Sequence, residues 1–337
     1  MRKYFIPLLC VLFTLVLVRG IAETLNAPPE QGGEGIQQAL DRAGVGEEVV
    51  LKAGTYVIRQ PIYLRKDGQT LRGAGAKTIL ALADGASCPV VVLGNPMDRN
   101  KVPIHDLHVL DLVIDGNRTH QPAELSRSLP DGTPLNNDGI FAWYIDGGSV
   151  ERVTCRSCRS GGLVTSAEVR RLTVQDFTAY DNQFDGLACC LTEDSHFSQL
   201  NLHDNLAAGI SLDLSFNRNI IDRAVLTGND VGVFMRQSRS NVFSSVTICR
   251  SGHDGVFMAQ TGHTTRFGWL LMPDSDCSEN TFNDLRVTGC GGKAFQVHDD
   301  GCTNNIIDGG EFLGNVKGGF SQFGARLVLV RDLSVRP

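Results

Sequence analysis

A short glycine-centred motif returns along this chain at a nearly constant interval. Its glycines are Gly139, Gly162, Gly186, Gly209, Gly232 and Gly255. The steps between them are 23, 24, 23, 23 and 23 residues, and β-branched or aromatic residues surround each one, as in "NNDGIFAW" and "HDGVFMAQ". A fixed period in the low twenties indicates a solenoid, in which each repeat is one coil that packs on its neighbours.

Two further coils follow at 292–298 and 318–323, after a step that is longer by about fifteen residues. A second row of motifs ("NII", "NVF", "NTF", "NII") begins at Asn219, Asn241, Asn280 and Asn305, and its long step falls in the same place. The extra residues therefore lie near 261–277. The regular Leu-x-x-Leu-x-Leu frame of a leucine-rich repeat is missing, so the repeat predicts an all-β parallel β-helix.

Composition and charge agree with this fold and limit the partners. The chain has 37 glycines and only 7% aromatic residues, which favours a turn-rich β protein over a helical one. Its formal net charge is −6, and no run or stripe of Lys and Arg is present, so a nucleic-acid partner is not expected.

The N-terminus has the features of an export signal. A basic "MRK" precedes the apolar "YFIPLLCVLFTLVLV", and the small residues of "GIA" come just before Glu23. The alternative is an uncleaved anchor, but the apolar run is short for a bilayer span. We therefore expect a cleaved signal over 1–22, a secreted or periplasmic protein without a stable membrane anchor, and one β-helix domain over 23–337.

Nine cysteines remain after residue 22, and an odd number leaves at least one thiol free even where export allows disulfides. The "CRSC" at 155–158 has no second CxxC or HxxxH beside it, so a metal site is not expected. Buried cysteines that pack as small apolar residues are the preferred interpretation.

Alternation along a strand predicts which side chains face inward. Residues one and three after each glycine should form two core rows. The first is Ile140, Leu163, Leu187, Ile210, Val233, Val256, Ala294 and Phe320; the second is Ala142, Thr165, Cys189, Leu212, Met235, Met258, Gln296 and Gln322. Asparagines four before the glycine, Asn182, Asn205 and Asn315, are expected to stack as an amide ladder in a turn.

The segment 32–80, "GGEGIQQALDRAGVGEEVVLKAGTYVIRQPIYLRKDGQTLRGAGAKTIL", resembles the N-terminal cap of the pectate-lyase-like superfamily. The resemblance implies a right-handed parallel β-helix, with an amphipathic capping helix at about 30–48 and coils at about 49–335. Members include polysaccharide lyases, polygalacturonase-like glycosidases, uronan epimerases and phage tailspikes. It implies an extended polysaccharide in a groove and no organic cofactor; calcium is possible, but no calcium-loop motif is present.

"NNDGI" is similar to the "NTDGI" of polygalacturonases, which makes Asp138 a candidate acid or base. The next coil reads "SGGLVTS" where that family has a paired Asp, and the "GHG" and "RIK" motifs are absent, as is the "DPH" of the related alginate epimerases. The resemblance therefore leaves hydrolysis, elimination and epimerisation open.

Candidate catalytic residues come from rows that should face the groove. They are Asp138, Asp185, Asp213, Arg236, His253, Asp254 and Lys293. Asp213 and Arg236 lie four after their glycines on adjacent coils, so their side chains can meet, either as a catalytic pair or as a surface ion pair. The Asp residues before a glycine are either an acid/base set or turn residues. His253, Lys293 and Arg236 could abstract a proton and stabilise an enolate, or be solvated surface groups.

Candidate substrate-binding residues are Trp143, Gln237, Gln260, His263, Arg266 and Trp269. The last three belong to the long excursion after the Gly255 coil, and a second excursion at 118–135 precedes the Asp138 coil. We expect a protein that binds a polysaccharide, one that contains uronic acid, and cleaves it as a glycosidase or lyase. The alternatives are a non-catalytic glycan-binding or surface protein and a uronan C5-epimerase. The sequence does not indicate the oligomeric state.

Overall fold

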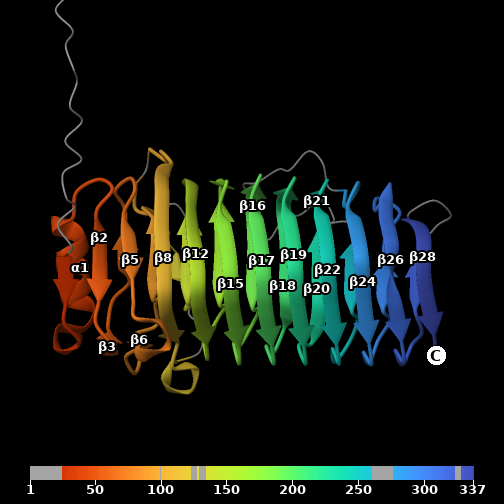
Figure 1. Cartoon of the computed structure of the whole chain (residues 1–337), viewed down its shortest axis with the longest axis horizontal. Helices are drawn as coiled ribbons and strands as arrows, with labels where there is room; N and C mark the ends of the chain where they lie inside the picture. The colour runs from red at the N-terminus through yellow and green to blue at the C-terminus, as the bar shows by residue number, and fades with distance from the viewer. Residues whose placement is uncertain (1–24, 99, 123–126, 129–133, 260–275, 323–327) are drawn as a thin grey trace, which may run out of the picture.

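The computed structural model describes residues 25–98, 100–122, 127–128, 134–259, 276–322 and 328–337. Its strands stack side by side along one long axis, and the chain advances by one coil at a time from the N-terminal to the C-terminal end (Figure 1). Almost every strand pairs in parallel with the equivalent strand of the next coil. The predicted parallel β-helix is therefore confirmed.

One row of stacked strands, called here the long ladder, runs the whole length of the solenoid. It consists of β1 (Leu25–Ala27), β2 (Glu48–Leu51), β5 (Thr70–Arg72), β8 (Ile104–Asp115), β12 (Ile145–Arg156), β15 (Thr173–Tyr180), β17 (His196–His203), β19 (Ile220–Thr227), β22 (Val242–Cys249), β24 (Thr281–Thr288), β26 (Asn305–Leu313) and β28 (Val328–Arg336).

Most strands of the long ladder bend at one residue with a left-handed backbone. The bend residue has φ +57° at Asp111, +52° at Arg152 and +52° at Asp176, and later coils repeat it at Gln199, Arg223, Ser245 and Asp284. A residue with a side chain rarely adopts this conformation. Because the same bend recurs at the same register, each strand turns the same corner and the coil keeps its shape. The strands β3 (Gly54–Ile58) and β6 (Thr78–Leu82) join the ladder beyond this corner.

The glycine motif forms a second row of strands, called here the motif ladder. It consists of β4 (Ile62–Leu64), β7 (Val91–Gly94), β11 (Ile140–Trp143), β13 (Leu163–Ala167), β16 (Leu187–Glu193), β18 (Ala208–Asn217), β20 (Val231–Arg236), β23 (Val256–Ala259), β25 (Phe295–Val297) and β27 (Phe320–Gln322). The short β14 (Val169–Arg170) and β21 (Ser238–Arg239) pair with the ends of β16 and β18. Outside both ladders, β9 (Arg127–Ser128) and β10 (Pro134–Leu135) form an antiparallel pair, and 3-10 turns occur at η1 (Pro29–Gln31), η2 (Gly75–Lys77) and η3 (Arg118–His120).

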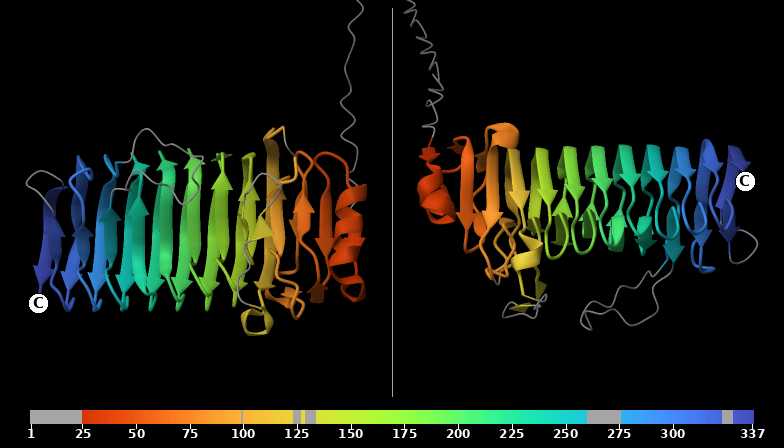
Figure 2. Two further views of the ribbon diagram at one scale, coloured as in Figure 1. Left: turned by 180° about the vertical axis from the view of Figure 1, so that it is seen from behind. Right: turned by 90° about the horizontal axis from the view of Figure 1, so that it is seen from below.

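A single α-helix, α1 (Gly32–Arg42), covers the N-terminal end of the solenoid (Figures 1 and 2). Its buried residues Ile36, Ala39 and Leu40 recur at the spacing of one helix face, and they join the core. Glu34 in the first turn and Arg42 in the last turn have the signs that the helix dipole favours. The predicted capping helix is thus confirmed.

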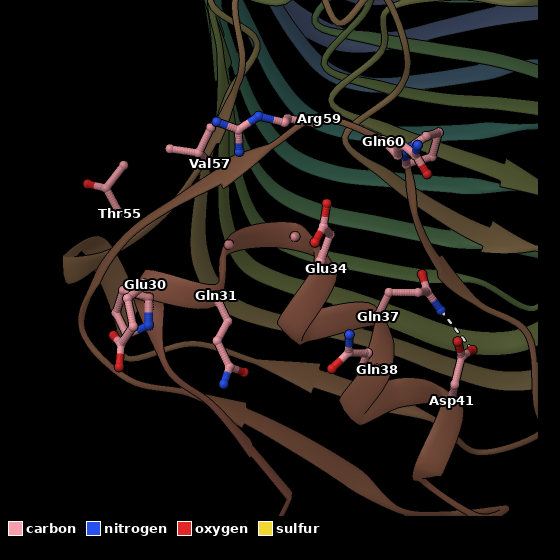
Figure 3. A pocket seen from close by; sticks show the side chains of 14 residues that line it. Glu30, Gln31, Glu34, Gln37, Gln38, Asp41, Thr55, Val57, Arg59 and Gln60 are labelled. Atoms are coloured by element: carbon pink, nitrogen blue, oxygen red, sulfur yellow. Dashed lines mark hydrogen bonds between the residues drawn. The ribbon is translucent and has the colours of Figure 1, made fainter.

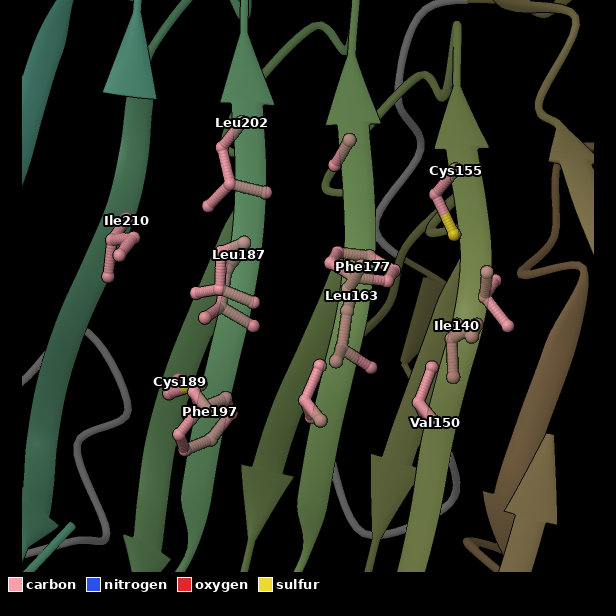
Figure 4. Close-up of a cluster of buried hydrophobic side chains, with 14 of the residues drawn as sticks. Ile140, Val150, Cys155, Leu163, Phe177, Leu187, Cys189, Phe197, Leu202 and Ile210 are labelled. Carbon is pink, nitrogen blue, oxygen red and sulfur yellow. The ribbon is translucent and has the colours of Figure 1, made fainter. Parts of the chain in front are cut away.

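The core is a column of apolar side chains that stack from coil to coil. Ile140, Leu163, Leu187 and Ile210 occupy one register position and are fully buried, as the sequence predicted (Figure 4). Burying one such side chain stabilises the fold by roughly 1.5–3 kcal/mol. The repeat of these contacts in every coil accounts for most of the favourable energy of the solenoid.

The motif glycine is required by the close approach of neighbouring coils. A Cβ atom at Gly139 would lie 2.5 Å from the carbonyl oxygen of Gly162 and 3.0 Å from the sulfur of Cys155. At Gly232 the distance to the carbonyl oxygen of Gly255 would be 2.4 Å. The two distances to carbonyl oxygen are too short for real atoms, so the glycine is structural at these positions.

Two buried amide ladders connect the coils at their corners. In the first, Nδ2 of Asn182 donates to Oδ1 of Asn205 at 2.8 Å, and Nδ2 of Asn205 donates to Oδ1 of Asn229 at 2.9 Å. The predicted stack is confirmed for Asn182 and Asn205, whereas Asn315 bonds to the backbone of Cys290 and Val287 and has no asparagine partner in the described residues. The second links the "N" positions of the second sequence motif: Asn219, Asn241, Asn280 and Asn305 bond in series at 2.9–3.3 Å. Each side chain also accepts a backbone N–H, so buried polar groups at the turns are satisfied.

Three aspartates just before the motif position bond to the backbone of the following coil. Oδ1 of Asp138 accepts the N–H of Gly161 at 3.1 Å, Oδ1 of Asp185 accepts that of Ala208 at 2.8 Å, and Oδ1 of Asp254 accepts that of Lys293 at 2.6 Å. Part of the Asp185 residue reaches solvent, but its carboxyl group is enclosed by protein. This loss of hydration raises the pKa of Asp185 to about 7.

The second amide ladder predicts a large effect of one substitution. We expect Asn241→Ala to lower the free energy of unfolding by about 2–4 kcal/mol, because the N–H of Asn219 and the carbonyl of Phe216 lose their buried partner. Denaturant-induced unfolding followed by circular dichroism measures this. The control is Asn201→Ala, at an exposed position of β17. Equal stability of the two variants would contradict the assigned role of the ladder.

The enclosed carboxyl group of Asp185 predicts a pH-dependent stability. Because its folded-state pKa of about 7 lies above the ordinary value of 3.8, the folded protein binds the proton more tightly than the unfolded chain. Its contribution to stability is therefore complete below about pH 4 and is lost as the pH rises towards 7. We expect Asp185→Asn to flatten the fall in unfolding midpoint between about pH 4 and pH 7, whereas Asp176→Asn, at an exposed position, should leave it unchanged.

Candidate active site on the motif ladder

The outward face of the motif ladder brings Asp213 and Arg236 into contact. The two residues follow the paired positions Leu212 and Met235 of β18 and β20, and Nη2 of Arg236 donates to Oδ2 of Asp213. The predicted meeting of these side chains is confirmed. The Asp213 side chain is only 16% exposed, whereas that of Arg236 is 41% exposed. The pair therefore has a covered carboxylate and a guanidinium that reaches solvent.

The covered position of Asp213 changes its acidity. Desolvation raises its pKa above the ordinary value, and the ion pair with Arg236 opposes this only in part. The Nε atom of Arg236 is buried without a hydrogen-bond partner in the described part of the chain. A raised carboxyl pKa next to a specific charge partner is typical of functional sites.

Two phenylalanines extend this site along the solenoid. The rings of Phe234 and Phe257 stack with an interplanar angle of 3° and centroids 5.5 Å apart, and both are half-buried. The guanidinium carbon of Arg236 lies 5.1 Å from the centre of the Phe234 ring. The flat arginine thus packs on an aromatic support, which favours one orientation of its donors.

The strand register adds His298 to the same row. Val256 pairs with Phe295 and Met258 with Val297, so Ala294 occupies the motif position that glycine has in earlier coils. The sequence-based alignment, which gave this position to Lys293, was wrong by one residue. As a result Val297 faces the core in place of Gln296, and His298 falls in the row of Asp213 and Arg236.

His298 is exposed and lies beside the aromatic pair. Its backbone N–H donates to the carbonyl of Met258 at 2.8 Å, and its ring centre is 5.5 Å from that of Phe257. One coil, which contributes only the methyl group of Ala259 to the row, separates it from Arg236. Two coil steps correspond to about 10 Å. The row therefore presents a carboxylate, a guanidinium and an imidazole along one line.

The remaining predicted catalytic residues lie elsewhere. Asp138 is 1% exposed, and like Asp185 and Asp254 it holds the backbone of the next coil. These three precede their strands, whereas Arg236 pairs with Ala259 at the last position of β23. The structure thus assigns the three aspartates a structural contact and does not bring them to Asp213 and Arg236.

His253 and Lys293 are also at the opposite end of the strands from Arg236. Nδ1 of His253 lies 2.6 Å from Oδ1 of Asp230, and both side chains are exposed. Lys293 donates its backbone N–H to Asp254, and its ammonium group points towards Gly318. The sequence-predicted set of His253, Lys293 and Arg236 is therefore not assembled in one place.

Two predicted substrate-binding residues are buried. The Trp143 side chain is 3% exposed and packs with Phe141 at a centroid distance of 5.8 Å, and its edge meets Tyr144. Gln237 is buried at a left-handed bend after β20. In this structure neither offers its side chain to a ligand on the surface. Gln260, His263, Arg266 and Trp269 lie outside the described residues.

A separate pocket of about 970 Å³ lies against the capping helix, far along the chain from this row. Glu30, Glu34, Asp41 and Arg59 are among its lining residues, and Gln37 donates to Asp41 across its wall (Figure 3). None of the residues predicted for the site lines it.

Within the described ranges no cluster of three His, Cys, Asp or Glu side chains could hold a metal ion, and no helix has the length and hydrophobicity of a bilayer span.

Sequence reasoning missed Phe234, Phe257 and His298. The two phenylalanines share the position two after the motif glycine, which was predicted to face outward, so their row was a usable signal. His298 was displaced by the one-residue error in register. The second motif row would have revealed that error. Thr281 pairs with Ile306 in the long ladder, a step of 25 residues, and the same step back from Gly319 gives Ala294 as the motif position.

Similar folds are found among solved structures. The A-module of a mannuronan C-5 epimerase from Azotobacter vinelandii aligns with a TM-score of 0.60 and 18% identity over 90% of this chain and 95% of that one. An endo-xylogalacturonan hydrolase from Aspergillus tubingensis aligns with a TM-score of 0.60 and 11% identity over 92% of each chain. A family 28 exopolygalacturonase from Yersinia enterocolitica gives 0.58 and 13%, over 92% of this chain and 76% of that one. At these identities the likeness establishes the fold.

No curated protein matches the chain in sequence. The family model described as "Right handed beta helix region" matches residues 111–248 and 196–332, which together span more than half of the chain. The solenoid, its coil-to-coil register and this match agree, and the chain belongs to the right-handed β-helix family.

Proposed function

We propose that this protein binds an extended uronate-containing polysaccharide along the outward face of the motif ladder and removes the C5 proton of a bound uronate. The observation that supports this most is the row of Asp213, Arg236 and His298, in which a solvent-reaching arginine is held between a carboxylate and an aromatic ring. A solenoid face suits a long polymer because successive coils offer successive subsites at a constant spacing.

The chemistry needs a cation at the sugar carboxylate and a base near C5. Arg236 can donate paired hydrogen bonds to the carboxylate, which neutralises its charge and stabilises the enolate that forms when the C5–H bond breaks. His298 is the residue of this row that can accept the proton. If the C4–O bond then breaks and the leaving oxygen takes up a proton, the product is an unsaturated uronate. If a proton returns to the other face of C5, the product is the epimer.

Asp213 fits a positioning role in this scheme. Its carboxylate bonds to Arg236 and is largely covered, so it limits the directions in which the guanidinium points. Burial makes the negative charge of Asp213 less favourable and so raises its pKa, and the proximity of Arg236 compensates for this only partly. The carboxylate of a bound uronate would share the Arg236 guanidinium with Asp213. A substrate whose carboxylate lies in the right place would therefore bind more tightly than a neutral sugar.

Glycoside hydrolysis is less favoured than removal of the C5 proton. Inverting and retaining glycosidases need two carboxyl groups about 5–9.5 Å apart across the bond. Among the described residues, Asp138, Asp185 and Asp254 are engaged with the backbone, and Asp213 has an arginine as its ion-pair partner. A binding protein without catalysis is the second candidate, because a stacked phenylalanine pair with an arginine on it is also a complete ligand-binding surface.

The reaction class can be decided by incubating the protein with pectic, alginate and neutral polysaccharides in D₂O. We expect deuterium at C5 of a uronate if the carbanion is reprotonated from the solvent, or the absorbance of an unsaturated uronate, whose C5 carries no hydrogen, if elimination follows. New reducing ends without either signal would identify a hydrolase and overturn the proposal. Binding without any chemical change on the whole panel would support the non-catalytic alternative.

The two reacting side chains can be tested by substitution. We expect His298→Ala and Arg236→Gln each to lower the rate of C5 exchange by about 10²–10⁴-fold, the usual contribution of a general base or a charge stabiliser. Arg223→Gln is the matched control, because Arg223 lies on the long ladder and pairs with its neighbour Asp222. Full activity of His298→Ala with normal unfolding behaviour would remove this residue from the mechanism.

Asp213→Asn tests the positioning role separately. We expect KM to rise by about tenfold and kcat to change less, because the guanidinium keeps its charge but loses the partner that orients it. Asp213→Glu should recover part of the loss. An equal loss in kcat would assign Asp213 to the chemical step itself.

A further inference from the structure

Two buried cysteines face each other on adjacent coils near the C-terminal end. Thr281 pairs with Ile306 in β24 and β26, and extending this register back towards the turn brings Cys277 opposite Cys302. The backbone confirms the extension, since the N–H of Cys277 donates to the carbonyl of Gly301 at 3.4 Å and that of Glu279 to Thr303 at 3.0 Å. Residues paired in this way are about 4.8 Å apart, within the range of Cα separations that a disulfide spans.

The surroundings of the two sulfur atoms are closed to solvent. Cys277 and Cys302 are both fully buried free thiols in this structure, and the Cys302 side chain is close enough to contribute to the raised pKa of Cys277. Burial raises the pKa of the Cys277 thiol well above its ordinary value, so an uncharged form of the sulfur is favoured there. The amide of Asn280 is 3.9 Å from the Cys277 sulfur, and that of Asn305 donates to the Cys277 carbonyl at 2.9 Å. The pair therefore continues the second amide ladder.

The strand register places no second cysteine opposite Cys155, Cys189, Cys190 or Cys249. Cys249 pairs with Thr288, Cys155 with Ala179, and Cys190 with Asp213, so a different residue type stands opposite each of them. Cys189 pairs with Leu212 in the core. Among the described residues, in-register stacking thus selects one cysteine pair.

We propose that Cys277 and Cys302 form a disulfide that staples two adjacent coils. Formation removes one hydrogen from each thiol: two electrons and two protons leave, and the sulfur atoms join. The acceptor of the electrons is a low-molecular-weight or protein disulfide, which is reduced to two thiols by exchange. Cys302 follows His298 by a single turn, so the disulfide would also fix the turn that comes directly after the row of Asp213, Arg236 and His298. It does not depend on the proposed enzymatic function.

The test uses the full chain folded with glutathione disulfide as the oxidant. After folding, the protein is denatured in the presence of N-ethylmaleimide, which labels free thiols. It is then digested without reduction and mapped by mass spectrometry. We expect Cys277 and Cys302 to escape labelling and to occur in one linked peptide pair, which separates and becomes labelled after reduction. Labelling of both cysteines in the denatured, unreduced protein, or a link from either of them to another cysteine, would overturn the proposal.

Variants show whether the link acts as a staple. We expect reduction to lower the thermal midpoint of the unaltered protein by roughly 5 °C, and to have no further effect on Cys277→Ser or Cys302→Ser. Cys249→Ser, at a half-exposed position opposite a threonine, is the control and should keep the response to reduction. If reduction changes the midpoint of the unaltered protein and of Cys277→Ser equally, the cross-link is not at this pair.

Discussion

Every part of this molecule depends on coils that stack in register at the spacing of β-strands. The spacing places like residues above like residues. A favourable contact is therefore repeated in each coil, and an unfavourable contact would be repeated as well. Aliphatic rows fill the interior, and asparagine rows satisfy the backbone at two corners. Buried polar groups without partners would be costly at the same position in all coils, and the amide ladders prevent that cost.

The candidate site uses the same rule on the outer face. Stacking holds Asp213 against Arg236 and Phe234 against Phe257, with the guanidinium of Arg236 over the first ring, although each side chain comes from a different coil or row. Holding these groups in place costs little at the moment of binding, because the backbone that supports them is already ordered by the core. A rigid face of this kind favours a ligand that is itself extended and regular.

The sequence was sufficient to predict the fold, the capping helix, the first core row up to Val256, the Asn182–Asn205 step of the first amide ladder and the contact of Asp213 with Arg236. All of these follow from a period that the glycines mark directly. The prediction failed where alanine replaced glycine at Ala294, because without a glycine to mark it the motif position was given to Lys293, and a shift of one residue exchanges the two faces of a strand. The burial of Trp143 and Gln237, and the raised pKa values of Asp185 and Asp213, depend on what covers each group in three dimensions, and spacing alone does not encode this.

The left-handed bend in the long ladder has a consequence for how such a chain can change in length. Asp111, Arg152, Asp176 and their successors turn the strand at one level, so the loss or gain of a single residue within a strand would move the corner of one coil away from those above and below it. Duplication or deletion of a whole coil leaves every corner aligned. An insertion between two strands does so too if the next strand keeps its register: after Ala259 of β23, pairing with the next coil resumes at Cys277. This molecule can therefore change in length by whole coils, or by insertions between strands that keep the register of the next strand.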